Sequence, residues 1–204
     1  MCFFTQQSKD AVELENRFDA KYDNYSNHLK SKYINGFTFP QTPIISNKNV
    51  DIIQNFQWGL IPHWAKDDGI KKYTLNAKIE TLNEKPSYRD AVNNRCLVIA
   101  DGFFEWQWLD SKGKRKQKHL ISMPNDELFT FAGIWSEWKD KKSNKVVYSY
   151  SIVTTDANEL LSKIHNSKKR MPVILTKENE QAWLNNETLN NFKKINIELT
   201  TCMV

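Results

Sequence analysis

Residues 95–155 constrain the fold most, because long apolar runs alternate there with short charged turns. RCLVIADGFFEWQW (95–108) predicts a central strand that is broken or bulged at Gly102. SKGKRKQ then predicts a hairpin turn, and KHLISM predicts its return strand. LFTFAGIWSEW and KVVYSYSIVTT predict a second strand pair around the charged tip KDKKSNK. This part of the chain therefore favours antiparallel sheet.

The first third of the chain predicts one helix and two short extended segments. Residues 8–22 have apolar positions at helical spacing, and Ser8 is placed to cap the helix. GFTFPQTPII (36–45) has turn and edge-strand character because Pro40 and Pro43 interrupt it. FQWGLIPHW (56–64) predicts a short apolar strand that ends at Pro62.

The last third predicts two more helices and two strands. DANELLSKIH predicts a helix with Asp156 and Glu159 at capping-box spacing. KKRMPVIL leads into a strand, TKENEQAWLNN predicts a helix capped by Thr176, and INIELTTCMV predicts a final strand. Because strands do not alternate regularly with helices, we expect an α+β fold. The whole chain, 1–204, is expected to form a single strand-rich domain of mainly antiparallel, barrel-like sheets with a few flanking helices.

The overall composition is that of a single globular domain with a modest basic excess. The 204 residues carry a net charge of +5, which permits a polyanionic partner without proving one. Three cysteines without a C-x-x-C pair argue against a disulfide framework or a zinc site and fit a reducing compartment. No segment resembles a signal peptide or a membrane span. We therefore expect a cytoplasmic protein that needs no metal or cofactor, and a monomer by default.

Cys2 stands directly behind the initiator methionine in MCFF. If Met1 is removed, Cys2 carries a thiol and a free α-amine on adjacent carbons, and both are nucleophiles. Alone, however, a cysteine at this position is most simply a small apolar residue. LNAKIETL (75–82), which contains Asn76 and Lys78, is likewise most simply a connection with a solvated lysine.

Two further segments contain residues suited to acid–base chemistry. Glu105 lies between Phe104 and Trp106, where burial would raise its pKa toward neutrality, although a glutamate at a strand end could equally reach water. His165 ends a predicted helix, a place where the helix dipole alone favours histidine. The basic runs 112–118 and 168–170 indicate solvated turns that add non-specific electrostatic attraction.

Taken together, these segments resemble one family. Cys2, WGLIPHW, NAKIET, ADGFFEW and IHNSKKRMPVIL occur in the order and approximate spacing of the SOS response-associated peptidase (SRAP) family. The resemblance covers essentially the whole chain and implies an SRAP-like fold. It also implies binding to single-stranded DNA at an abasic site and a covalent link through the N-terminal cysteine, in the DNA damage response.

The resemblance assigns roles to individual residues. It implies that Cys2 is the nucleophile and that Asn76, Glu105 and His165 complete the catalytic set. The DNA-binding residues that it implies are Trp64, which wedges against bases, the phosphate-binding Lys78 and Arg170, and also Trp58 and Pro40. The partner would be single-stranded DNA with abasic sites, and the protein would be nucleoid-associated.

The sequence also departs from the family pattern. The usual opening is M-C-G-R, whereas Phe3 and Phe4 follow Cys2 here, so a DNA contact from that arginine is missing. Lys78 replaces the arginine of N-A-R, which keeps the charge but loses bidentate geometry. Two extra residues separate His165 from Arg170. The C-terminus also looks short for the family.

The expected chemistry depends on a 1,2-aminothiol. The α-amine attacks the aldehyde of an abasic sugar to give a Schiff base, and the thiol then closes a five-membered thiazolidine. Glu105 would shuttle protons, Asn76 would orient Cys2 and the sugar oxygen, and His165 would act as general acid–base at that oxygen. Self-cleavage and a host aminopeptidase both remain open as the route that removes Met1.

Two other functions remain open from the sequence. An N-terminal-nucleophile amidohydrolase would also expose Cys2, but it would need an oxyanion hole, and no Gly-rich N-G-D-type loop is present. A non-catalytic module that binds single-stranded DNA would use the aromatic strands and basic loops with an inert Cys2.

Overall fold

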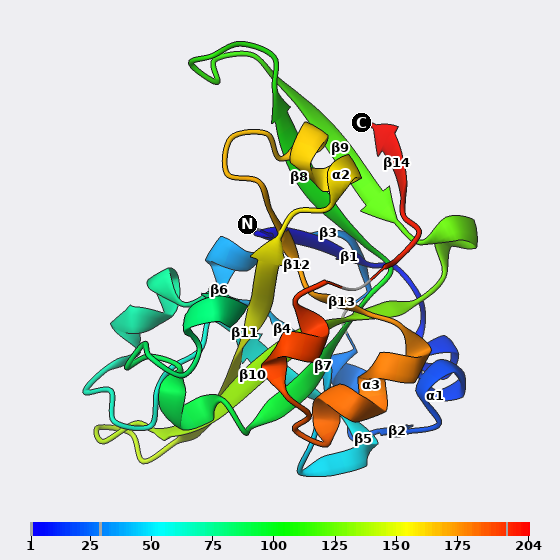
Figure 1. Cartoon of the computed structure of the whole chain (residues 1–204). Coiled ribbons are helices and arrows are strands. Elements are labelled where there is room, and N and C mark those ends of the chain that lie inside the picture. Colours follow the sequence, from blue (N-terminus) through cyan, green and yellow to red (C-terminus); the bar gives the residue numbers. More distant parts are fainter. Residues whose placement is uncertain (1, 29, 195) are drawn as a thin grey trace.

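The computed structural model describes residues 2–28, 30–194 and 196–204. Two sheets build the molecule (Figure 1). The five-stranded sheet has the order β14-β9-β8-β1-β3. Its strands are β1 (Phe4–Gln7), β3 (Ser31–Asn35), β8 (Gly102–Trp108), β9 (Lys116–Ser122) and β14 (Thr200–Met203).

The second sheet is larger, with the order β12-β11-β10-β7-β4-β5-β2, and β13 and β6 pair with β10 and β11 at its side. Its strands are β2 (Lys21–Tyr22), β4 (Gln41–Ser46), β5 (Asn49–Trp58), β6 (Asn76–Lys78), β7 (Arg95–Ala100), β10 (Phe129–Lys139), β11 (Val146–Asp156), β12 (Arg170–Pro172) and β13 (Ile174–Leu175). The α-helices are α1 (Ala11–Phe18), α2 (Glu159–Ile164) and α3 (Lys177–Leu184). The predicted strand-rich α+β fold is thus confirmed.

The two predicted hairpins are confirmed. β8 pairs with β9 from Phe103↔Ile121 to Trp108↔Lys116, and β10 pairs with β11 from Gly133↔Ile152 to Lys139↔Val146. The β8–β9 hairpin projects from the body of the molecule at the top of Figure 1. Most strand pairs are antiparallel, but β6 and β5 both pair with β11 in parallel.

The break predicted near Gly102 is confirmed at Asp101, but it is a corner rather than a bulge, because the chain changes sheets there. β7 belongs to the large sheet and β8 to the small one. The buried carboxylate of Asp101 accepts hydrogen bonds from the backbone N–H and the hydroxyl of Ser8, and the Asp101 N–H donates to Gln6 at 3.0 Å. Ser8, the residue directly after β1, therefore fixes the corner at which the chain passes from one sheet to the other.

Two helix caps and one strand boundary differ from the prediction. Ser8 is held by Asp101, so α1 starts later, with Asp10 as N-cap and Glu13 completing a capping box. Asn158, not Asp156, caps α2 by accepting from the Leu161 N–H at 2.9 Å. Thr176 is the N-cap of α3, as predicted. The extended segment 56–64 is only the end of β5, which stops at Trp58.

The core falls into two large clusters of buried apolar side chains. One of them contains Cys2 together with Trp58, Phe103 and Tyr150, so the start of the chain is part of the folded core. Within the described part of the chain, no helix combines the length and apolar character needed to cross a membrane.

Candidate active site

Asn76 connects the start of the chain to the large sheet. Its strand, β6, lies parallel to β11 with Asn76 opposite Ile152. The Asn76 amide Nδ2 donates to the main-chain oxygen of Cys2 at 2.7 Å. The Tyr88 hydroxyl donates to the main-chain oxygen of Asn76 at 3.0 Å. Asn76 is therefore held in place from its own backbone while its side chain holds Cys2.

Cys2 is fully buried in this arrangement. Its thiol lies 3.8 Å from the carbonyl oxygen of Phe4, within reach of a weak S–H···O bond. Burial, and then the negative charge of Glu105, raise the pKa of the thiol above its ordinary value. The sulfur is thus kept as a thiol at neutral pH, and it needs a base before it can attack.

Glu105 meets the expectation of a desolvated carboxylate. It lies on β8 opposite His119, and the residue is only 4% exposed. Burial raises the pKa of Glu105 from 4.5 to about 7. At neutral pH the carboxyl group is therefore divided between its acid and base forms, which suits it to proton transfer in both directions.

His165 ends α2 as its C-cap, as the sequence predicted, and its ring is buried. Nδ1 lies 2.7 Å from the carbonyl oxygen of Arg170, and since that oxygen can only accept, we assign the proton to Nδ1. Nε2 is then the unprotonated nitrogen, and it lies 3.9 Å from Glu105 Oε2. Burial lowers the pKa of His165, which favours this neutral form.

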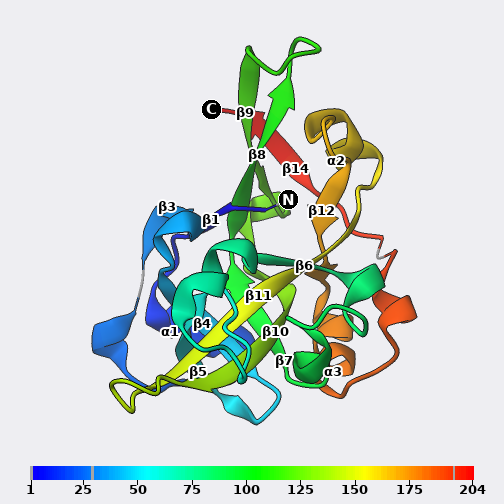
Figure 2. The ribbon, with the colours of Figure 1, turned by 90° about the vertical axis from the view of Figure 1, so that its left-hand side faces the viewer.

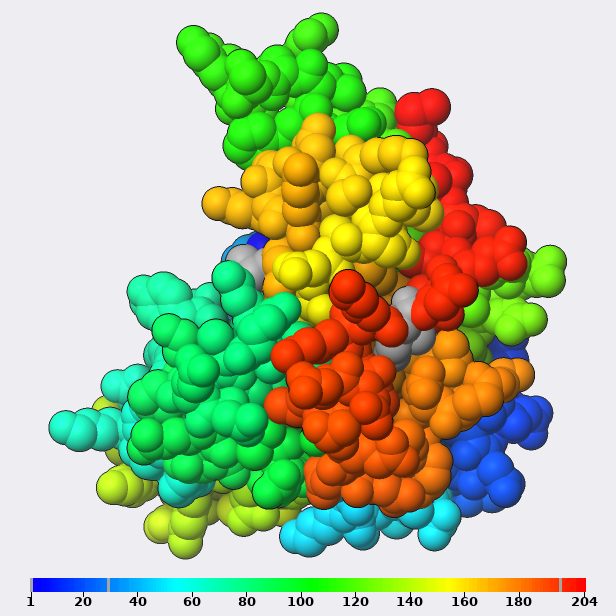
Figure 3. Space-filling model, in the orientation of Figure 1, coloured from blue at the N-terminus to red at the C-terminus, as the bar shows by residue number. Residues whose placement is uncertain are grey.

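The four predicted catalytic residues therefore converge from four separate elements, as a common site requires. Figure 2 shows the start of β1 on the same side of the molecule as β6, β12 and α2. In Figure 3 a notch separates the gold and orange α2–β12 segment from the teal segment that contains β6, and blue atoms of the N-terminal segment are visible in it. Within the described ranges, no group of three or more His, Cys, Asp or Glu residues could hold a metal ion.

The sequence suggested that Arg170 contacts a phosphate, but its guanidinium is already bonded to neighbouring groups of the protein. Its guanidinium pairs with both carboxylate oxygens of Glu80, at 2.8 and 2.9 Å, and with Asp156 at 2.7 Å. It also donates to the main-chain oxygen of Thr154 at 2.8 Å. Burial alone would raise the pKa of Glu80, but the hydrogen bond and charge of Arg170 lower it. Arg170 thus joins β12 to β11 and to the segment after β6.

The four other predicted DNA contacts divide into two groups. Trp58 is fully buried and donates its indole N–H to the Leu75 carbonyl at 2.9 Å, so its ring offers no face to a base. Pro40 is partly buried, and its carbonyl accepts from the Trp58 N–H. Trp64, which is 46% exposed, and the exposed Lys78 remain accessible to a ligand. The expectation for Trp58 is corrected: its aromatic ring belongs to the core.

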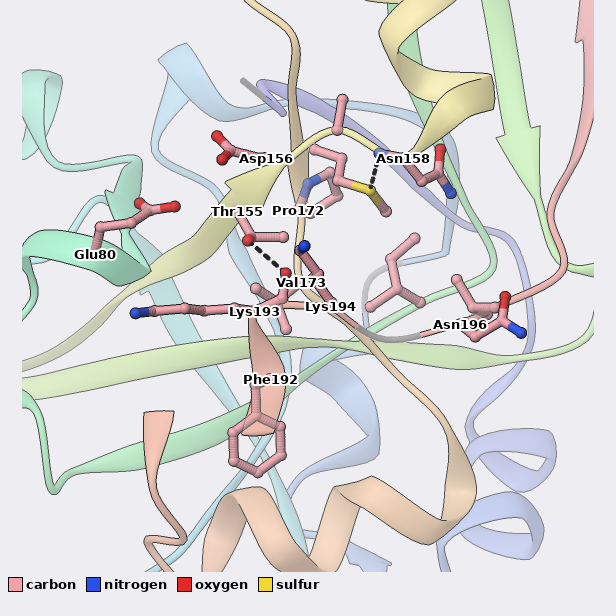
Figure 4. A pocket seen from close by; sticks show the side chains of 14 residues that line it. Glu80, Thr155, Asp156, Asn158, Pro172, Val173, Phe192, Lys193, Lys194 and Asn196 are labelled. Atoms are coloured by element: carbon pink, nitrogen blue, oxygen red, sulfur yellow. Dashed lines mark hydrogen bonds between the residues drawn. The ribbon is translucent and has the colours of Figure 1, made fainter. Parts of the chain in front are cut away.

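A cavity of about 460 Å³ adjoins the Arg170 ion pairs, because Glu80 and Asp156 both line it. Figure 4 shows its walls, which come from the end of β11, from β12 and from the segment around Phe192 and Lys193. The Thr155 hydroxyl donates to the Lys193 carbonyl across it at 2.8 Å. Its lining does not include any of the four predicted catalytic residues, so this cavity neighbours the site without forming it.

Sequence reasoning missed Tyr88 and Glu80. Tyr88 lies in an irregular segment and gives no local signal, because its partner Asn76 is fixed only by the fold. Glu80 is part of NAKIET, but its role depends on Arg170, which lies 90 positions later.

Comparison with known families gives a match over nearly the whole chain. The model of the family described as "SOS response associated peptidase (SRAP)" matches residues 1–201. The chain is 45% identical over 143 residues to the Bacillus subtilis protein named abasic site processing protein YoqW, covering 70% of this chain and 61% of that protein. It is 35% identical to the Gallus gallus abasic site processing protein HMCES, covering 61% of this chain and 42% of that protein. The chain thus spans less than two thirds of these curated relatives.

Solved structures share the fold. A crystal structure of a Bacteroides thetaiotaomicron protein superposes with a TM-score of 0.91 at 34% identity, covering the whole of this chain and 92% of that one. A Bordetella bronchiseptica protein superposes with a TM-score of 0.83 at 20% identity, covering 100% and 99% of the two chains. The second likeness concerns the fold alone.

Proposed function

Because the chain belongs to the SOS response associated peptidase (SRAP) family, we propose that it processes abasic sites in DNA by a covalent link through Cys2. Its relatives YoqW and HMCES are named abasic site processing proteins, which supports this substrate. The observation that carries the proposal is the position of Cys2. Its main chain is held by Asn76, and its thiol lies in the field of Glu105, whose pKa is raised to about 7.

The reaction begins with the α-amine of Cys2, which is freed when Met1 is removed. An abasic deoxyribose opens to an aldehyde, and the amine nitrogen adds to its C1′ carbon. Loss of one water gives an imine. The amine acts first because the thiol is held in its neutral form by burial and by the charge of Glu105.

The thiol then closes the ring. Sulfur adds to the imine carbon, its proton passes to a base, and the imine nitrogen gains a proton, so that the thiazolidine forms without a further leaving group. Glu105 is the base and acid for these transfers, because its raised pKa lets it accept and return a proton near pH 7. Asn76 keeps the Cys2 backbone from turning away during both steps.

His165 acts as the general acid–base at the sugar oxygen. Its Nδ1 proton is held by the Arg170 carbonyl, so the unprotonated Nε2 accepts a proton from the sugar hydroxyl during ring opening and returns it on reversal. Single-stranded DNA is the expected substrate form, with the exposed Trp64 ring stacked on a base and Lys78 on a flanking phosphate.

The test is a denaturing gel of the Met1-free protein with single-stranded DNA that carries one abasic site. Intact mass first establishes that Cys2 is the N-terminus. We expect a shifted band that survives denaturation with wild type and is lost with Cys2→Ala. Cys2→Ser should lose the stable band but give a band after borohydride reduction, because the amine still forms the imine. Wild type without a stable band would overturn the proposal.

A further inference from the structure

The five-stranded sheet and the turn after β3 carry aromatic and lysine side chains around Phe4, two positions after Cys2. We call this set, Phe4, Tyr33, Phe37, Trp106 and Lys118, the aromatic face. Phe4 begins β1 two positions after Cys2, and its neighbours come from β3, from the 3-10 turn Gly36–Thr38 that follows β3, and from β8 and β9. Tyr33 and Phe37 are 44% and 50% exposed, and Phe37 contacts the ring of Phe3, the residue after the proposed nucleophile, with centroids 4.9 Å apart.

The rings of the aromatic face touch one another. Phe4 stacks on Tyr33 with ring centroids 5.2 Å apart and meets the edge-on ring of Trp106 at 4.9 Å. Phe37 lies 6.2 Å from Phe4. These contacts order the rings into one surface, which lowers the entropic cost of stacking a ligand on it.

Lysines alternate with these rings. Lys118 lies opposite Trp106 in the β8–β9 pair, and its Nζ lies 4.6 Å above the Tyr33 ring. Two pairs further along the hairpin, Lys116 lies 5.6 Å above the ring of Trp108. The projecting tip of the hairpin in Figure 1 then adds the exposed cations Lys112, Lys114 and Arg115. Positive charge therefore continues from the aromatic face along the whole hairpin.

We propose that the aromatic face and the hairpin bind the single-stranded DNA on one side of the reacting nucleotide, which rests on the proposed function. Bases stack on the Tyr33 and Phe37 rings, and phosphates pair with Lys118 and Lys116. The alternation of rings and ammonium groups matches the alternation of bases and phosphates in a single strand. A protein partner fits less well, because lysine is depleted at the centre of protein interfaces.

The test measures equilibrium binding of a fluorescent undamaged single strand in a Cys2→Ala background, by anisotropy at several salt concentrations. No abasic-site chemistry takes part, so the outcome is independent of whether Cys2 reacts. Tyr33→Ala should weaken binding at least about fivefold, the lower end of one lost base stack. The matched control is Tyr25→Ala, an exposed tyrosine beside β2, which should bind like wild type. Lys118→Gln should reduce the salt slope by about one.

A second arm tests the direction of the strand. Strands that carry an abasic site are extended by about four nucleotides on one side or the other. We expect the extension to tighten DNA binding on one side of the abasic site only, and Tyr33→Ala should remove that gain in affinity. The proposal would be overturned if Tyr33→Ala and Tyr25→Ala weakened DNA binding equally, or if neither weakened it. A concentration-dependent dimer that Tyr33→Ala dissociates while DNA binding stays unchanged would also overturn it, since the face would then be a contact between copies.

Discussion

The side-chain amide of Asn76 donates a 2.7 Å hydrogen bond to the main-chain oxygen of Cys2, although 74 positions separate the two residues. That oxygen belongs to the carbonyl next to the α-carbon of Cys2, which carries both the amine and the thiol-bearing side chain. A single hydrogen bond therefore limits rotation of both proposed nucleophiles. Asn76 is itself fixed by β6 and by the Tyr88 hydroxyl, so the restraint comes from the folded sheet.

Asn76→Ala should slow the covalent reaction about tenfold or more while leaving DNA binding nearly unchanged. The substitution leaves the carbonyl of Cys2 without its donor, which costs about 1–3 kcal/mol for a buried group and frees the backbone that carries the nucleophile. Single-turnover crosslinking at saturating DNA measures the rate. Asn16→Ala, at an exposed position of α1, is the matched control. A rate equal to that of the control would remove the orienting role of Asn76.

Glu105→Gln should change the pH dependence of stability. The pKa of Glu105 is raised from 4.5 to about 7 in the folded protein, so its contribution is favourable below pH 4.5 and is lost as the pH rises to about 7. Above that pH the wild type must bury a charge that the glutamine variant lacks. Relative to wild type, the variant should therefore gain about 2 kcal/mol in free energy of unfolding between pH 5 and pH 8.

Denaturant unfolding at the two pH values measures this gain, and Glu84→Gln replaces an exposed carboxylate as the control. The same Glu105 variant should crosslink more slowly and lose the pH dependence that the wild type shows near pH 7. If the free energies of unfolding of the variant and the wild type differed by the same amount at pH 5 and at pH 8, the burial of an ionisable Glu105 would be contradicted.

Arg170→Lys should destabilise the fold, with little change in the salt dependence of DNA binding. Lysine keeps the charge but cannot form the paired hydrogen bonds to Glu80 together with those to Asp156 and the Thr154 carbonyl. Arg170 itself is buried, and the loss of its charged hydrogen bonds to Glu80 and Thr154 should cost about 1–3 kcal/mol. Thermal and denaturant unfolding test this, with the exposed Arg89→Lys as control. A smaller salt slope at unchanged stability would instead support a phosphate contact.

The site could be predicted from the sequence where local surroundings decide the outcome. Glu105 stands in an apolar run between Phe104 and Trp106, so the sequence offered burial as one of two alternatives, and the residue is buried. His165 ends a helix as its sequence indicates, and both hairpins follow from apolar runs around charged turns.

The features that the sequence did not predict depend on partners that lie far apart along the chain. Arg170 lies in a basic run that resembles a solvated turn, and only the fold brings Glu80 to it across 90 positions. The run 95–108 is continuous in hydrophobicity, but its corner at Asp101 depends on Ser8, 93 positions earlier. Local patterns cannot show such pairs, because each partner alone has an ordinary alternative in solvent.

Trp58 and Trp64 belong to one aromatic segment of the sequence, but they should respond in opposite ways to substitution. Trp58 is fully buried and hydrogen-bonded to Leu75, so Trp58→Ala should cost about 3–5 kcal/mol of stability. Trp64 is 46% exposed, so Trp64→Ala should change stability by less than about 0.5 kcal/mol. If its ring stacks on a base, Trp64→Ala should weaken binding of single-stranded DNA by about 1–3 kcal/mol. Unfolding curves and anisotropy on both variants separate the two roles, and a Trp64→Ala protein that binds like wild type would leave the stacking position to another ring.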